Sequence, residues 1–76
     1  MPGEYQSPVL IHHYRNGDKK HLVEVEHAQT GRILASCMIG DDEGMERLAD
    51  LLSAKKLPRE AMAIRNLMRE ARKVRA

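Results

Sequence analysis

Four histidines and one cysteine are the side chains of this sequence best suited to bind a metal ion: His12, His13, His21, His27 and Cys37. A structural zinc site needs about four ligands, and these often follow spacings such as C-x-x-C or H-x-x-H. No such spacing occurs here, and neighbours such as His12 and His13 would point to opposite faces of a strand. Only His13 and His21 are expected to pair across a hairpin. We therefore predict no metal site and no cofactor.

Nucleophilic catalysis requires a nucleophile with a base within hydrogen-bond reach. Cys37 falls at an inward-facing strand position, where a thiol behaves as a small apolar group. Asp41, Asp42 and Glu43 are predicted to begin a helix, because acidic side chains cap and stabilise a helix N-terminus. The chain also has no glycine-rich phosphate loop. We therefore expect a protein that is not an enzyme.

Basic side chains gather near the C-terminus, where they offer a different chemistry, phosphate binding. Arg65, Arg69 and Arg72 have the spacing of one helical stripe. Such a stripe can follow the phosphates of a nucleic acid, although most stripes of this kind are the solvated face of a terminal helix. The net charge is only +2, too small to imply a polyanionic partner by itself. A small nucleic-acid-binding or regulatory domain is therefore the alternative prediction.

Two turns, at residues 16–18 and 29–31, organise the first half of the chain. Each contains a glycine and lies between short runs of Val, Ile and Leu, the pattern of a β-hairpin. Three-residue loops would align three pairs on one face of a three-stranded antiparallel sheet over residues 8–39: Val9 and Ile11, Val25 and Val23, Ala35 and Cys37. In the same register Ala28 lies opposite Arg32 across the second turn.

The second half, residues 41–75, is predicted to form two helices. Asp41 or Asp42 caps the first, and Pro58 fits the first turn of the second. The apolar stripes that should pack on the sheet are Met45, Leu48 and Leu52 in the first helix and Ala61, Ile64, Met68 and Ala71 in the second. The fold class is thus α+β, β-β-β-α-α, with both helices on one sheet face. Residues 1–76 form a single small domain, in which 1–7 are a loose N-terminal arm.

The two faces of the predicted sheet differ in composition. The helices are expected to cover Val9, Ile11, Val23, Val25, Ile33, Ala35, Cys37 and Ile39. The other face should carry Leu10, His12, Tyr14, Lys20, Leu22, Glu24, Glu26, Arg32, Leu34, Ser36 and Met38. This mixture of apolar, aromatic and charged residues is typical of a binding patch, although a small sheet also tolerates some exposed leucine. A dimer partner or the N-terminal arm would also account for it.

The cysteine content and the length of the apolar runs indicate the cellular compartment of the protein. A single cysteine excludes an internal disulfide and fits a reducing environment. No apolar run is long enough to span a bilayer, and no signal peptide precedes the first strand. We expect a soluble cytoplasmic protein, monomeric or homodimeric, that does not contact membranes.

Several short sequence features follow one another along the chain. They are Tyr14 before the Asn16-Gly17 turn and Lys19 after it, Glu24 and Glu26, Gly31, Asp42 and Glu46, and finally Asn66, Met68, Glu70 and Arg72. With this series, from residue 14 to residue 72, the chain resembles the small phage-encoded anti-CRISPR proteins that inhibit type I-F surveillance complexes. The resemblance implies a sheet packed on two helices and binding to the CRISPR effector complex in the cytoplasm of the bacterial host.

The same resemblance implies which residues bind. In that family, tyrosines and a glutamate on the sheet contact the crRNA-binding backbone subunit, so that target DNA cannot pair with the guide. Tyr14 takes the place of the tyrosine at the turn, Glu24 or Glu26 that of the glutamate, and Tyr5 is a loose counterpart of another tyrosine. Leu22 and Met38, on the face of Tyr14, complete the predicted partner-binding set.

Overall fold

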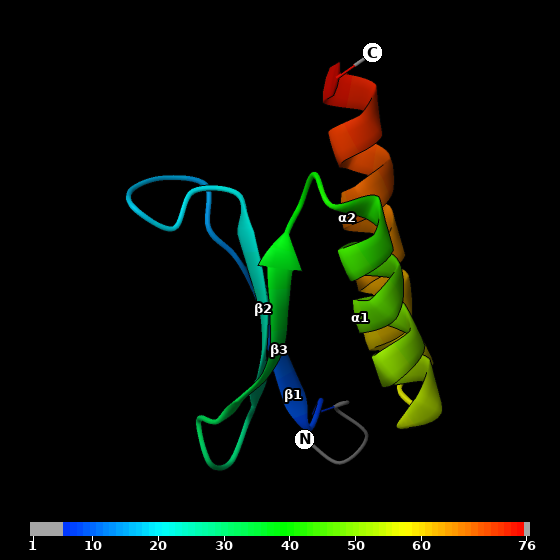
Figure 1. Ribbon diagram of the computed structural model, residues 1–76. Coiled ribbons are helices and arrows are strands. Elements are labelled where there is room, and N and C mark those ends of the chain that lie inside the picture. Colours follow the sequence, from blue (N-terminus) through cyan, green and yellow to red (C-terminus); the bar gives the residue numbers. More distant parts are fainter. Residues whose placement is uncertain (1–5, 76) are drawn as a thin grey trace.

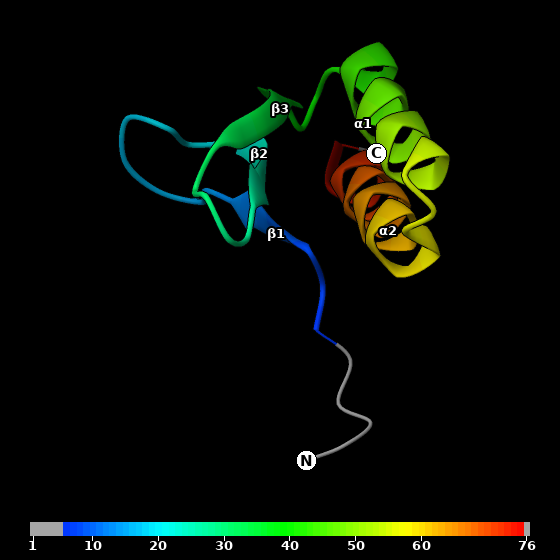
Figure 2. The same ribbon diagram turned by 90° about the horizontal axis from the view of Figure 1, so that it is seen from below.

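The fold is a three-stranded antiparallel sheet followed by two helices, as seen in a computed structural model that describes residues 6–75 (Figure 1). Strands β1 (Val9–His13), β2 (Leu22–His27) and β3 (Ile33–Met38) lie side by side in sequence order. Helices α1 (Asp42–Ala54) and α2 (Pro58–Arg75) follow, and both lie on the same side of the sheet (Figure 2). The predicted α+β class and element order are confirmed. Residues 1–5 of the predicted arm, Tyr5 included, lie outside the described residues.

The core fills the space between the sheet and the helix pair. Ten apolar residues, each at most 4% exposed, form it: Val9, Val23, Val25, Met45, Leu48, Ala49, Leu52, Ala61, Ile64 and Met68. The strand members alternate with outward-facing residues, and the helical members recur every three or four positions. Because these two periods select the same residues that the structure buries, the predicted inward faces of β2 and of both helices are confirmed. No helix within residues 6–75 is long and apolar enough to cross a bilayer.

Helix α1 begins in direct contact with the end of β3. Asp41 is its N-cap, with extended backbone, and the Asp41 Oδ1 atom accepts a hydrogen bond from the Gly44 amide at 3.1 Å. Asp42 and Glu43 follow in the first turn, where carboxylates interact favourably with the helix dipole. A Cβ atom added at Gly44 would lie 2.9 Å from Cys37 Cβ and 2.5 Å from Asp41 Oδ2. The close approach of α1 to β3 therefore requires glycine at position 44.

Replacement of the cap tests how much this start contributes to stability. Asp41→Ala is expected to lower the free energy of unfolding by about 0.5–2 kcal/mol, because the Gly44 amide loses its acceptor. Asp41→Ser retains a capping oxygen and should cost much less. Urea denaturation of both variants measures the difference. Equal losses for Ala and Ser would show that the cap hydrogen bond does not stabilise α1.

The register of the first hairpin differs by two residues from the predicted one. Val9 lies opposite His27 and Ile11 opposite Val25, where Val25 and Val23 were predicted as the partners. The strand faces are unchanged, because a two-residue shift preserves the alternation. His13 consequently lies opposite Val23, and the predicted pairing of His13 with His21 is wrong.

A longer loop with a bulge causes this shift. The β1–β2 connection turns where the Lys20 amide donates to the Gly17 carbonyl at 3.1 Å. Tyr14 then pairs with two consecutive residues: its carbonyl accepts from the His21 amide at 2.7 Å, and its amide donates to the Leu22 carbonyl at 2.9 Å. His21 has φ of +73°, the left-handed conformation that the first residue of a G1-type β-bulge adopts, usually as glycine. Lys20 thus lies in the loop and not on the open sheet face.

The second hairpin follows the predicted register until a bulge near its turn. Val23 lies opposite Cys37 and Val25 opposite Ala35, as predicted. The register then shifts between Val25 and Glu26, so that Glu26 lies opposite Ile33. The turn itself closes one residue earlier than predicted, because the His27 amide donates to the Arg32 carbonyl at 2.7 Å.

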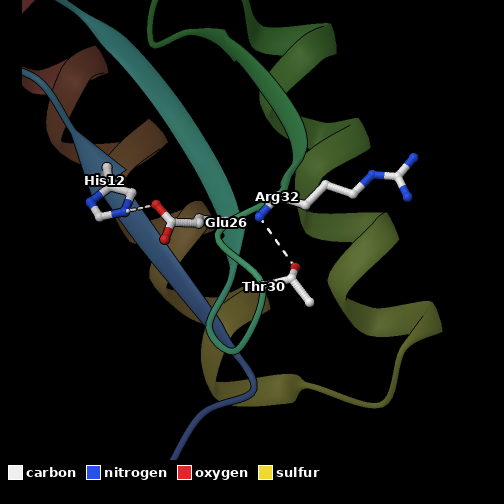
Figure 3. Close-up of polar contacts among 4 residues, drawn as sticks. All are labelled: His12, Glu26, Thr30 and Arg32. Atoms are coloured by element: carbon white, nitrogen blue, oxygen red, sulfur yellow. Dashed lines mark hydrogen bonds and ion pairs between the residues drawn. The ribbon is translucent and has the colours of Figure 1, made fainter.

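This shift exchanges the faces of two neighbouring apolar residues. Ile33, opposite Glu26, lies on the open side and is 43% exposed, whereas Leu34 packs against the core. The sequence alternation predicted the reverse for both. Arg32 is also reversed, since its side chain points away from Glu26 (Figure 3).

Candidate functional site

The sheet face that the helices leave uncovered, here called the open face, carries three cross-strand rows. They follow from the strand pairing: Leu10, Glu26 and Ile33; His12, Glu24 and Ser36; Tyr14, Leu22 and Met38. The middle row is polar, and most of the apolar surface lies in the two outer rows. Leu10 is 45% exposed and Met38 49%, similar to Ile33. The open face therefore combines accessible apolar groups with a central polar strip.

Both hairpin loops extend on the side of the open face. In Figures 1 and 2 the β1–β2 and β2–β3 connections extend away from the helix pair. The open face is thus bordered by a loop at each end. The β1–β2 loop adds exposed cations, Arg15, Lys19 and Lys20, beside the acidic residues of β2.

Glu26 is held by a histidine on the neighbouring strand. The His12 Nε2 atom lies 2.9 Å from Glu26 Oε1, and both side chains are partly exposed (Figure 3). The two residues are diagonal neighbours, because His12 lies directly opposite Glu24. Beside them, Thr30 Oγ1 accepts from the Arg32 amide at 3.3 Å and stabilises the β2–β3 turn. The Glu26 carboxylate is therefore oriented before any partner binds.

Tyr14 is half-buried and held in place by charged and aromatic neighbours. The neighbouring Glu24 carboxylate is the largest cause of its raised pKa, because its interaction with the phenol hydroxyl favours the neutral form; partial desolvation and the charges of Glu24 and Glu26 contribute further. The Lys19 Nζ atom lies 5.2 Å from the ring centroid, in cation–π range. The His12 ring centroid lies 6.2 Å from that of Tyr14. The ring is thereby pre-oriented, which lowers the entropy lost on binding.

The open face brings together the described members of the predicted partner-binding set. Tyr14, Leu22 and Met38 form one outer row, Glu24 lies in the middle row, and Glu26 lies in the other outer row. Sequence reasoning placed Leu10 and His12 on this face without assigning them a role, although both contribute to its surface. Ile33 was missed because only the bulge brings it to this side.

The arginines of the alternative nucleic-acid site lie along the acidic side of α1. Arg65 Nη2 is 3.7 Å from Asp50 Oδ1, and Arg72 Nη2 is 3.7 Å from Asp42 Oδ2. Arg69 is exposed between them on α2, and Glu46 occupies the matching position on α1. Exposed ion pairs stabilise a protein by only about 0–1 kcal/mol each. These pairs matter more for the electrostatic potential, because the acidic side chains of α1 partly cancel the positive charge of the α2 arginines.

Oligonucleotide binding measures whether the α2 arginines act as a phosphate site. We expect weak, non-specific binding to a mixed-sequence oligonucleotide near physiological salt, with an affinity that falls steeply as salt increases. Fluorescence anisotropy at two salt concentrations provides the measurement. A sub-micromolar complex that resists salt would instead favour the alternative function.

Cys37 and the histidines are the groups that the sequence suggested for nucleophilic catalysis and metal binding. Burial, followed by the charge of Asp41, raises the pKa of the Cys37 thiol, which disfavours the reactive thiolate. Within residues 6–75, no group of three or more histidine, cysteine or acidic side chains is arranged to hold a metal ion. Comparison with protein-family models, with curated proteins and with solved structures finds no match to this chain.

Proposed function

We propose that this protein is a small non-enzymatic binding protein whose open sheet face docks on a partner protein. The observation that carries the proposal is the pre-oriented Tyr14, set in a row with Leu22 and Met38 and with the Lys19 Nζ atom 5.2 Å from its ring centroid. Aromatic anchors surrounded by apolar and polar neighbours are the usual centres of protein interfaces. The two loops bordering the face would supply its polar rim.

The partner that we propose is a type I CRISPR surveillance complex, bound in the cytoplasm of a bacterial host by a phage-encoded inhibitor. The support for this identity is the sequence resemblance between residues 14 and 72. The crRNA-binding backbone subunit is the expected contact, because a protein surface that holds RNA is rich in lysine and arginine. Occupying that surface would prevent target DNA from pairing with the guide.

The chemistry of the open face suits a basic partner surface. Glu24 and Glu26 are two residues apart in β2 and therefore point to the same side of the sheet. A lysine or arginine of the partner can replace His12 as the neighbour of Glu26. A second one can bind Glu24 while Tyr14 packs beside that basic side chain. Such charge pairs chiefly accelerate association and select the partner, while the apolar contacts slow dissociation.

Competition for target DNA tests the proposal directly. A purified type I-F complex loaded with crRNA is incubated with this protein, and binding of labelled target DNA is followed by gel shift. We expect loss of DNA binding when the protein is in excess, and retention of the complex on the immobilised protein in biolayer interferometry. Arg59→Gln, a charge change at the far end of α2, is the matched control.

Two results would contradict the proposal in different ways. Undiminished DNA binding, with no retention on the sensor, would exclude this surveillance complex as the partner. A dimer in light scattering that is dissociated by Leu10→Asp would show that a second copy of the chain covers the open face. A protein that remains monomeric at micromolar concentration leaves the open face accessible to a different chain, as proposed.

A further inference from the structure

A second surface feature lies at one end of the sheet, where it shares Met38 and Arg15 with the edge of the open face. A cavity of about 660 Å³ separates the end of the sheet from the C-terminal half of α2. Its volume lies within the range of about 300–1,000 Å³ that is typical of small-molecule sites. Apolar residues of β3, of the segment after it and of α2 contribute to its lining, among them Met38, Ile39, Leu67 and Ala71.

The different lengths of the two helices explain where the cavity lies. Helix α2 has 18 residues and α1 has 13, and α2 continues past the start of α1 (Figure 1). The ion pair between Arg72 and Asp42 marks the level at which α1 begins. Near this level α2 faces the end of the sheet and the β1–β2 loop, and the core residues do not fill the space between them.

Three nitrogen-bearing side chains from the first hairpin line the same cavity: His13, Arg15 and His21. The His13 Nδ1 atom is shielded from solvent and has no hydrogen-bond partner among residues 6–75. Burial, followed by the charges of Arg15 and His21, lowers the pKa of His13. Arg15 and His21 thus lie near enough to His13 to disfavour its positively charged form, an effect that an anion between them would relieve.

The backbone of His21 supports the same interpretation. Its φ of +73° is uncommon for a residue other than glycine. A bulge in this conformation changes the direction of a side chain, and such residues are frequent beside functional sites. Here the bulge brings the His21 imidazole to the cavity lining, on the same side as His13.

One acidic residue also lines the cavity and limits what it can bind. The Glu70 carboxylate belongs to the lining, and its Oε1 atom lies 3.9 Å from the Lys73 ammonium. Lysine thus offsets the charge of Glu70. Within the described part of the chain, no ion pair neutralises Arg15. Arg15 is consequently the fixed cation on the hairpin side of the cavity, and the imidazoles of His13 and His21 lie beside it as hydrogen-bonding groups.

We propose that this cavity binds a small organic anion with an apolar body, such as a medium-chain carboxylate. The carboxylate would accept hydrogen bonds from Arg15 and from the imidazoles of His13 and His21. The alkyl body would contact Leu67 and Ala71 of α2. This site borders the open face at Met38 and does not depend on the partner proposed for that face.

Calorimetric titration with three probes separates the contributions of charge and of apolar body. Octanoate carries both, 1-octanol carries only the chain, and acetate carries only the charge. We expect octanoate to bind at least about tenfold more tightly than octanol, and acetate to show no measurable binding. In NMR titrations, octanoate should also raise the pKa of His13, because a nearby anion favours the imidazolium, whereas octanol should not.

Matched variants locate the binding. Arg15→Gln should weaken octanoate binding about tenfold, whereas Lys20→Gln, which removes the same charge from the same loop outside the lining, should leave it unchanged. Ala71→Phe should abolish binding by filling the cavity while the melting temperature is retained. Equal affinities for octanoate and octanol, equal effects of Arg15→Gln and Lys20→Gln, or no octanoate binding at millimolar concentration would each overturn the proposal.

Discussion

Tyr14→Ala is expected to weaken partner binding at least tenfold, on the order of the loss at an interface hot spot, while the melting temperature stays nearly unchanged. Tyr14 lies on the open face and is not part of the buried core, so its loss leaves no internal cavity. The variant removes the aromatic surface and also the phenol hydroxyl that interacts with Glu24. Biolayer interferometry with the surveillance complex and thermal melts of the free variant provide the two measurements.

Two further variants assign the loss to its cause. Tyr14→Phe retains the ring and removes the phenol hydroxyl near Glu24, so an intermediate loss would separate the contribution of aromatic packing from that of the hydroxyl. The double variant Arg65→Gln and Arg69→Gln changes α2 and leaves the open face intact. Binding that survives Tyr14→Ala but disappears in the arginine variant would move the interface from the sheet to α2.

Gly44→Ala is expected to destabilise the protein by about 1–3 kcal/mol, the usual cost of overpacking, although alanine normally favours a helix over glycine by about 1 kcal/mol. The added methyl group would overlap the Cys37 Cβ and the capping carboxylate of Asp41. Gly44→Val adds two more carbons at the same contact and should cost more. Urea denaturation of both variants measures the change in unfolding free energy.

A second glycine provides the control for this substitution. A Cβ atom at Gly40 would meet no atom within 4 Å, and the residue has no positive φ to maintain. Gly40→Ala should therefore leave stability unchanged or raise it slightly, by restricting the unfolded chain. Equal destabilisation by Gly44→Ala and Gly40→Ala would show that the contact between α1 and β3 is not the cause.

Much of the fold could be predicted because local pattern and tertiary burial agree. Val23 and Val25 alternate with glutamates, and Met45, Leu48 and Leu52 recur at helical spacing, so each set identifies its own inward face. The bulge beside Glu26 could not be predicted in this way. Ile33 and Leu34 are both large and apolar, so exchanging their faces leaves the hydrophobic pattern of the sequence unchanged.

The first hairpin shows a different limit of sequence reasoning. Glycine normally marks a left-handed position, and Gly17 does adopt positive φ. His21 adopts it as well, without glycine to signal it, and this bulge shifts the register by two residues. The contact of His12 with Glu26 depends on that register, so alternation alone placed both residues correctly but could not pair them.

The topology determines the order in which the elements of this fold can form during synthesis. Each strand pairs with the one synthesised just before it, so both hairpins can form early from local contacts. Their inward valines acquire a complete apolar cover only with Ala61, Ile64 and Met68 of α2. The nascent sheet therefore exposes apolar surface until the last quarter of the chain is made, and a premature stop in α2 would release an aggregation-prone polypeptide.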